Sequence, residues 1–313
     1  MKEYSSIYAD ADRERTPEQI WIAIMAHAST IGEAIRTFKV ESLSISAAHT
    51  FCWLCSFINK CNELKSDVFS INETLSGVVT LKYPSRCGHC KKLPCQCDAV
   101  EMDAQTDKAA NYKTLFQYRQ PHLLSYATWG IDEFLGMFNE IYAGRLHIQT
   151  LENIGFHFLE EVGEAAVAVR QLSQFNKITE HGIKGLDENF LNGLTTVDGL
   201  VENYEKYHNV EIKLSSRDPE ILKARLVMAK MALVVEIGDT FSWFCGILNK
   251  MLSIEKAIWE KPEEHVACKF TGLEIALNKE YFNGQGKAIC PTCKSKPCSC
   301  TFFNVSPKMG NPH

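Results

Sequence analysis

The sequence predicts an all-α protein made of two homologous helical domains of the four-helix-bundle type, each carrying a small zinc-binding cysteine loop. Three observations support this fold class. Long segments repeat apolar residues at helical spacing, no segment shows a convincing strand alternation, and several segments of the first half recur in the second half in the same order. The 313 residues are enough for two ordinary domains.

Four segments of the second half have apolar residues three and four positions apart, which is the spacing of one helix face. The third of them opens after "RDPE" (217–220), whose Asp-Pro pair is a helix start signal. We therefore expect helices over residues 129–142, 151–172, 221–252 and 263–282.

An internal repeat relates the two halves. The segment "TFCWLCSFINK" (50–60) matches "TFSWFCGILNK" (240–250), and "CGHCKKLPCQC" (87–97) matches "CPTCKSKPCSC" (290–300). Ile-Tyr-Ala opens both 7–20 and 141–154. Three matches in one order indicate a duplication, and two copies are too few for a solenoid. We expect two homologous domains that pack as an intramolecular pseudo-dimer; a homo-oligomer is the other possibility.

The repeat sets the expected domain boundaries. A degenerate first copy covers residues 1–98 and includes the cysteine loop 87–97, and a polar linker covers 99–119. The second copy covers 120–300 and contains a turn-rich insertion at about 173–224 and the cysteine loop 290–300. Residues 301–313 form a tail.

Five carboxylates interrupt apolar helical segments of the second copy. On a helix, positions three and four apart share a face, so each acidic group forms a stripe. Burying unpaired carboxylates is costly, and a divalent cation between two facing helices would offset their repulsion. Oxygen ligands suit Mg²⁺ or Mn²⁺. The five residues are Glu160, Glu161 and Glu164 in "FLEEVGEAAVAV", and Glu236 and Asp239 in "MALVVEIGDTF".

Glu-Glu-x-x-Glu followed by Glu-x-x-Asp on helices resembles the MazG-like all-α nucleoside triphosphate pyrophosphohydrolase superfamily. The resemblance implies a four-helix core and Mg²⁺-dependent hydrolysis of an NTP or dNTP to the monophosphate and pyrophosphate. It implies that Glu161, Glu164, Glu236 and Asp239 hold the cation and that Glu160, or one of the ligands such as Glu161, activates the water. The connection between the two motifs is longer here than is usual in the family, and the cysteine loops are not part of the family pattern.

Several basic and aromatic residues are candidates for substrate binding. Arg225, Lys250 and Lys269 could bind phosphate, and Trp243 could stack on a base. At about 1.5 Å per residue, Lys250 lies about 20 Å along the helix from Glu236, so it would reach only the far end of a substrate. Core packing is the alternative for Trp243.

The first copy has lost the acids. A gapless alignment of the repeats places Ala26, His27 and Thr30 at the positions of Glu160, Glu161 and Glu164. It also places Ser46 and His49 at the positions of Glu236 and Asp239. The two histidines could bind a softer metal or serve as polar core residues.

Eight of the 13 cysteines form two clusters with the spacing C-x2-C-x4-C-x-C. Four close thiolates suit tetrahedral Zn²⁺, and such closed sites are structural. An iron–sulfur cluster and a disulfide pair are the alternatives. The clusters are Cys87, Cys90, Cys95 and Cys97, and Cys290, Cys293, Cys298 and Cys300.

Composition limits the remaining function classes. A net charge of −5 does not favour nucleic acid or an anionic membrane as a partner. No apolar stretch reaches the ~20 residues that span a bilayer, and the N-terminus lacks a signal-peptide core, so we expect a cytoplasmic protein. The leading hypothesis is a nucleotide pyrophosphohydrolase. The alternative is a non-catalytic zinc-containing helical protein that binds nucleotides or a protein partner.

Overall fold

The computed structural model describes residues 7–63, 74–97, 129–145, 148–182, 219–259, 273–282, 288–296 and 298. Within these ranges the regular structure is helical, apart from one isolated bridge between Phe282 and Ala288. The prediction of an all-α fold is confirmed. The expected linker 99–119, the tail 301–313 and the centre of the insertion, residues 183–218, lie outside the described residues. Among the described helices, none has both the length and the apolar composition needed to cross a membrane.

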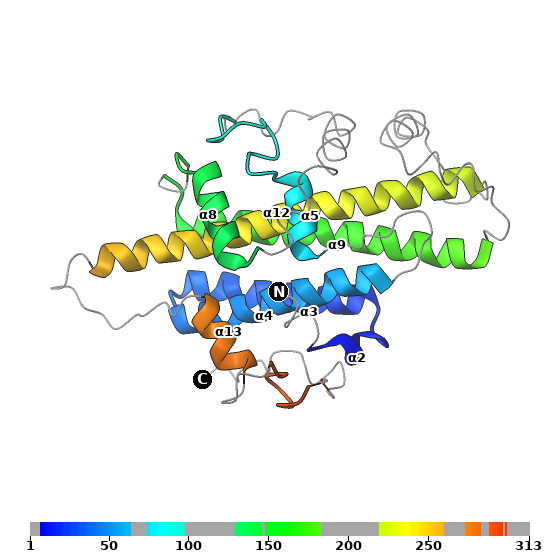
Figure 1. Ribbon diagram of the computed structural model, residues 1–313, viewed down its shortest axis with the longest axis horizontal. Helices are drawn as coiled ribbons and strands as arrows, with labels where there is room; N and C mark the ends of the chain where they lie inside the picture. Colours follow the sequence, from blue (N-terminus) through cyan, green and yellow to red (C-terminus); the bar gives the residue numbers. More distant parts are fainter. Residues whose placement is uncertain are drawn as a thin grey trace.

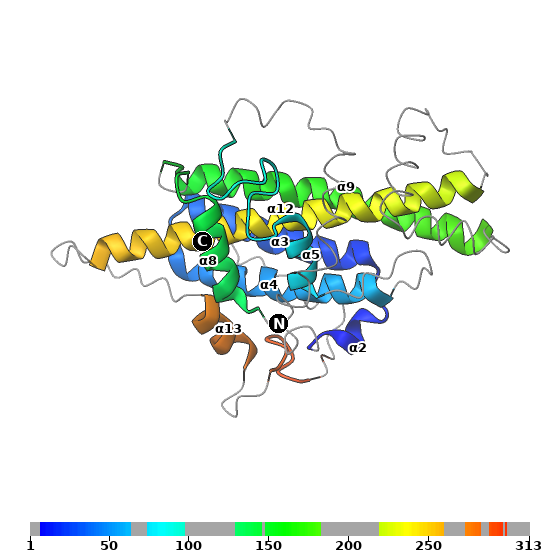
Figure 2. The same ribbon diagram turned by 45° about the horizontal axis from the view of Figure 1, so that its top comes forward.

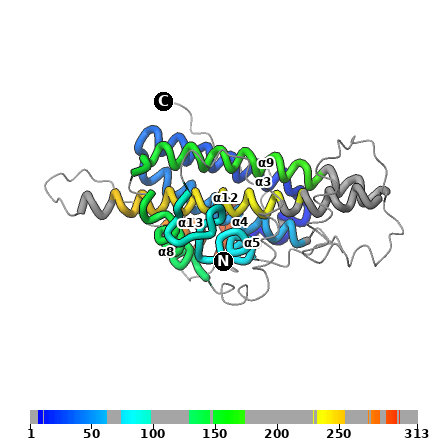
Figure 3. The backbone as a smooth tube through the Cα atoms, turned by 90° about the horizontal axis from the view of Figure 1, so that it is seen from above, coloured from blue at the N-terminus to red at the C-terminus, as the bar shows by residue number. Residues whose placement is uncertain are grey.

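Four long helices form the core (Figure 1). They are α3 (Pro17–Arg36), α4 (Val40–Glu63), α9 (Leu151–Gly182) and α12 (Pro219–Trp259). α3 packs against both α4 and α9, and α9 packs along α12. Seen from above, α3 and α9 lie side by side along one flank of the bundle (Figure 3).

The ends of α3 follow from local sequence. Thr16 caps the helix by accepting a hydrogen bond from the Gln19 N–H, while the Gln19 side chain accepts one from the Thr16 N–H, which satisfies two donors that a helix start leaves free. After Arg36 the chain passes through Phe38 in the left-handed region, with φ 53°, and the Lys39 N–H bonds back to the Ala34 carbonyl. This tight turn lets α4 fold back against α3.

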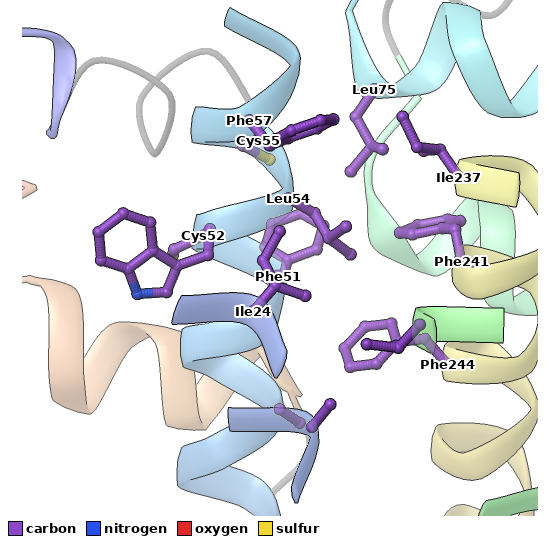
Figure 4. Packing of buried hydrophobic residues seen from close by; sticks show 14 of the residues in the cluster. Ile24, Phe51, Cys52, Leu54, Cys55, Phe57, Leu75, Ile237, Phe241 and Phe244 are labelled. Atoms are coloured by element: carbon purple, nitrogen blue, oxygen red, sulfur yellow. The ribbon is translucent and has the colours of Figure 1, made fainter. Parts of the chain in front are cut away.

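Both halves of the chain contribute to one hydrophobic cluster. Phe51 and Leu54 of α4 point toward Phe241 and Phe244 of α12, and all four are buried (Figure 4). These residues occupy matching positions in "TFCWL" and "TFSWF". On the opposite flank, the indole N–H of Trp21 on α3 donates to a carbonyl of α9 at 3.1 Å. The repeated segments of α4 and α12 therefore face each other within one hydrophobic core.

The short helices are exchanged between the halves (Figures 1 and 2). α5 (Leu75–Lys82) follows α4 in the chain but packs mainly against α12, beside α8 (Ile131–Ile141). α13 (Leu273–Tyr281) follows α12 but packs against α4, where α2 (Ala9–Asp12) also lies. Each half thus covers the second long helix of the other half.

Each cysteine loop also forms a backbone hydrogen bond with the opposite half of the chain. The Cys95 N–H donates to the Ile141 carbonyl at 2.7 Å, and the Cys298 N–H donates to the Ile7 carbonyl at 3.1 Å. Both cysteines are third in their motif, and both isoleucines open an Ile-Tyr-Ala segment. Matching residues therefore make matching contacts, each from one half to the other.

Candidate functional site

The acidic stripes of α9 and α12 face each other. Glu161 and Glu164 of α9 and Glu236 of α12 each place a carboxylate oxygen within 4.8 Å of the others. Glu161 and Glu236 are half-buried, and Glu164 is exposed. We call these three residues the acidic cluster. The structure therefore brings together three of the four carboxylates that the sequence suggests as cation ligands.

The acidic cluster is electrostatically unfavourable without a counter-ion. Burial, with the nearby negative charges of Asp239, Glu236 and Glu164, raises the pKa of Glu161 to about 9, although Lys82 acts in the opposite direction. Glu161 is consequently protonated at neutral pH when no cation is bound. A divalent cation would favour the ionised form, and the oxygen-only donor set fits Mg²⁺ or Mn²⁺.

Asp239, the fourth suggested ligand, has a different environment. Its carboxylate accepts a hydrogen bond from the Tyr83 hydroxyl at 2.5 Å and forms an ion pair with the Lys82 ammonium. The side chains of Lys82 and Asp239 are only 15% and 18% exposed. Lys82 and Tyr83, at the end of α5 in the first half of the chain, therefore balance the charge of Asp239 and hydrogen-bond its carboxylate.

Lys82 and Tyr83 are site residues that the repeat pattern did not suggest. The available signal is modest: a tyrosine ends both short helices that precede a cysteine loop, in "LKYPSRC" and in "KEYFNGQGKAIC". Nothing in that pattern indicates that the tyrosine contacts the opposite half. Only the exchange of α5 places it beside Asp239.

Glu160 lies outside the acidic cluster. Its side chain is 61% exposed, and one of its oxygens lies 3.2 Å from His157 Nδ1. The His157 ring stacks on Trp243, with ring centroids 4.5 Å apart and an interplanar angle of 20°. His157 therefore contacts both Glu160, the suggested water-activating residue, and Trp243, the suggested base-stacking residue. His157 lies one helical turn before Glu161 on α9.

The suggested phosphate-binding residues are less informative. Lys250 is half-buried on α12, seven positions beyond Trp243. Arg225 lies on α12 but outside the residues whose side chains are described, and Lys269 lies outside the described residues altogether.

The first half carries histidines at the corresponding place. The rings of His27 and His49 stack with centroids 4.7 Å apart, and His49 Nδ1 lies 2.7 Å from the Tyr281 hydroxyl. Burial, assisted by the charge of His49, lowers the pKa of His27 to about 3, and burial, assisted by Lys294, lowers the pKa of His49 to about 4. Both rings are therefore neutral at physiological pH. Tyr281 approaches His49 as Tyr83 approaches Asp239, in agreement with the gapless alignment of the repeats.

The first cysteine loop can hold a metal ion. One sulfur atom from each of its four cysteines lies within 4.8 Å of the other three. Backbone N–H groups of His89 and Gln96 donate to the sulfurs of Cys87 and Cys90 at 3.4 and 3.3 Å. Burial raises the pKa of Cys90, but the N–H groups of Gln96 and Lys92 and the neighbouring thiols outweigh it and lower the pKa to about 6. A four-sulfur donor set suits Zn²⁺.

The second loop has the same backbone turn. Lys91 and Lys294, each four positions after the first cysteine of its loop, have φ values of 58° and 56°. Their N–H groups donate to the carbonyls of Cys87 and Cys290 at 3.1 and 2.9 Å. The described sulfurs of Cys290, Cys293 and Cys298 form a second metal-competent group, while Cys300 lies outside the described residues.

Comparison with known proteins identifies no relative. No family model matches the chain, no curated protein matches it, and no solved structure matches its fold.

Proposed function

We propose that this protein is a Mg²⁺- or Mn²⁺-dependent pyrophosphohydrolase that converts a nucleoside triphosphate to the monophosphate and pyrophosphate. The observation that carries the proposal is the convergence of Glu161, Glu164 and Glu236 from two apolar helices. Three carboxylates in one place, one of them with a strongly raised pKa, are costly unless a cation binds them. The proposal agrees with the resemblance of the two acidic motifs to the MazG-like superfamily.

The residues of the acidic cluster would hold the cation. When bound, it would neutralise phosphate oxygens and make a coordinated water more acidic. In the proposed reaction the water oxygen forms a bond to the α-phosphorus, and the bond from that phosphorus to the bridging oxygen of pyrophosphate breaks. Glu160, or a ligand carboxylate such as Glu161, takes the proton of the attacking water.

Zinc has a structural role in this proposal. The two cysteine loops follow α5 and α13 and bond to Ile141 and Ile7 of the opposite half. A closed four-sulfur site leaves no open position for a substrate. Zinc at the loops would therefore stabilise the exchanged short helices.

The deciding experiment is hydrolysis of each NTP and dNTP by the purified protein, with Mg²⁺ or Mn²⁺ and a pyrophosphate readout. Glu161→Gln and Glu236→Gln should lower turnover by at least ~100-fold, because each removes a ligand charge. Glu152→Gln, at an exposed position near the start of α9, is the matched control and should be unchanged. If no nucleotide is hydrolysed with either cation, the proposed activity is wrong, and the alternative is a non-catalytic protein that binds nucleotides or a protein partner.

A further inference from the structure

Lys82 is a cation placed inside acidic surroundings. It forms an ion pair with Asp239, which lies one helical turn beyond Glu236 of the acidic cluster on α12. The Lys82 side chain is only 15% exposed, so its ammonium group lies beside the acidic cluster and not in open solvent.

The backbone on both sides leaves space for the Lys82 stem. A Cβ atom at Gly238 of α12 would lie 3.2 Å from Lys82 Cβ and Cδ. A Cβ atom at Gly88 of the cysteine loop would lie 3.1 Å from Lys82 Cγ and 3.0 Å from Tyr83 Cε1. Two glycines from different halves of the chain therefore border one side chain. Larger residues at either position would push it away from Asp239.

A second ammonium group lies close by. The Lys91 Nζ donates to the carbonyl of Gly88, the residue that borders Lys82. Two neighbouring ammonium groups repel each other, and a polyvalent anion between them would relieve that repulsion.

The two halves of the chain differ at the position that Lys82 occupies, and the lysine is on the side of the acidic cluster. The residue before the repeated tyrosine is Lys82 in the first half and Glu280 in the second. Tyr83 faces Asp239 beside the acidic cluster, whereas Tyr281 faces the neutral His49. A lysine therefore precedes the tyrosine only on the side where carboxylates could hold a metal–phosphate complex.

We propose that Lys82, with Lys91 beside it, binds the phosphate chain of the substrate, so that the first half of the chain supplies the polyphosphate-binding residues of the acidic site. This inference rests on the proposed function. Glu161, Glu164 and Glu236 would hold the cation, which would supply positive charge for the reacting phosphate, and the two lysines would neutralise the charge of the departing pyrophosphate. An ammonium group has three donors, so Lys82 can keep its bond to Asp239 and donate to a phosphate oxygen as well.

The test is binding of inorganic pyrophosphate in the presence of Mg²⁺, measured by calorimetry on the full-length, zinc-loaded protein. Lys82→Met should weaken binding at least ~10-fold, and Lys91→Met should weaken it by a smaller factor, because each removes one charge from the anion site. Lys92→Met, in the same loop, and Lys294→Met, at the position in the second loop that matches Lys91, should change it less than ~2-fold. Zinc content is measured for every variant, since Lys91 adjoins Cys90.

Two further variants separate binding from folding. Lys82→Arg should retain pyrophosphate binding, because the charge is kept. Lys82→Met combined with Asp239→Asn removes both partners of the ion pair, so this double variant should fold like the wild type. Its affinity for pyrophosphate should stay as low as that of Lys82→Met. A double variant that binds as tightly as the wild type would overturn the inference.

The outcome is separable from that of the proposed function. If the wild type hydrolyses nucleotides but Lys82→Met changes neither KM nor pyrophosphate affinity, the inference fails and the proposed function stands. If the wild type hydrolyses nothing but binds pyrophosphate through Lys82, the anion site stands and the proposed function fails. If the wild type does not bind pyrophosphate, the inference is wrong.

Discussion

Tyr83 donates a hydrogen bond of 2.5 Å to Asp239, a residue 156 positions away in the chain. Its counterpart joins Tyr281 to His49 at 2.7 Å across 232 positions. Each tyrosine comes from the short helix of one half and reaches the second long helix of the other half. The contacts are therefore reciprocal: the surroundings of Asp239 and of His49 each include a tyrosine from the other half of the chain.

Zinc should be present at about two ions per chain, one for each cysteine loop. Cys87→Ser and Cys290→Ser should each remove one ion and lower the melting temperature, because metal binding contributes directly to folding. Elemental analysis and thermal melts measure both effects. Cys55→Ala, at a buried cysteine outside the loops, should leave the zinc content unchanged. Iron in place of zinc, or no metal in the reduced protein, would contradict this prediction.

Glu161→Gln should stabilise the protein when no divalent cation is added. The pKa of Glu161 is about 9 in the folded state, against 4.5 for an unperturbed glutamate, so folding takes up a proton between these pH values. The wild type therefore loses stability as pH rises from 4.5 toward 9, whereas the variant does not. At pH 8 we expect the variant to melt at least roughly 2 °C higher.

Added Mg²⁺ should reverse that order, since only the wild type can bind it fully. Metal-free buffers must be prepared without chelators that would strip the cysteine loops. A variant that is less stable than the wild type at pH 8 without Mg²⁺ would show that Glu161 is ionised and stabilising there.

The histidine pair should make the protein sensitive to mild acid. His27 and His49 have pKa values of about 3 and about 4 when folded, against 6.5 for an unperturbed histidine. Their stabilising contribution is complete above pH 6.5 and is lost as pH falls toward the folded values, because the unfolded chain takes up the protons.

His27→Phe keeps a flat ring beside His49 but cannot titrate. Between pH 7 and 5.5 it should therefore reduce the slope of unfolding free energy against pH, by at most about 1.4 kcal/mol per pH unit. Urea unfolding at several pH values measures the slope. An unchanged slope would mean that folding does not lower the pKa of His27.

Two glycines of α9 should respond in opposite ways to alanine. A Cβ atom at Gly163 meets nothing within 4 Å, so Gly163→Ala should stabilise the helix by about 0.5–1 kcal/mol. A Cβ atom at Gly155 would lie 2.7 Å from Ile35 Cδ1 of α3. Gly155→Ala should therefore leave the free energy of unfolding unchanged or lower it, because the added methyl group overlaps Ile35. Chemical denaturation of both variants tests the order. A Gly155→Ala variant as stable as Gly163→Ala would show that α3 and α9 pack less closely.

Much of the fold was predictable because helical periodicity is a local property. The expected helices at 129–142, 151–172 and 221–252 correspond to α8, α9 and α12, although α9 and α12 extend further into the insertion, to Gly182 and from Pro219. The helix expected over 263–282 is described only as Leu273–Tyr281. The cysteine spacing likewise predicts the metal-competent loops, because four nearby ligands in sequence are forced to lie close together.

The amino-acid sequence by itself determined which residues share a helix face, so the convergence of Glu161, Glu164 and Glu236 could be inferred from spacing and from the cost of burying charge. The tertiary structure alone decided that Asp239 pairs with Lys82 and Tyr83, and that α5 crosses to α12. The physical reason is that periodicity specifies which face of a helix is buried but not which helix covers it. In a chain with two similar halves, both α4 and α12 offer a matching apolar face to the short helices. The choice between them depends on contacts between residues far apart in sequence, such as the bond from Tyr83 to Asp239 across 156 positions, which no local pattern encodes.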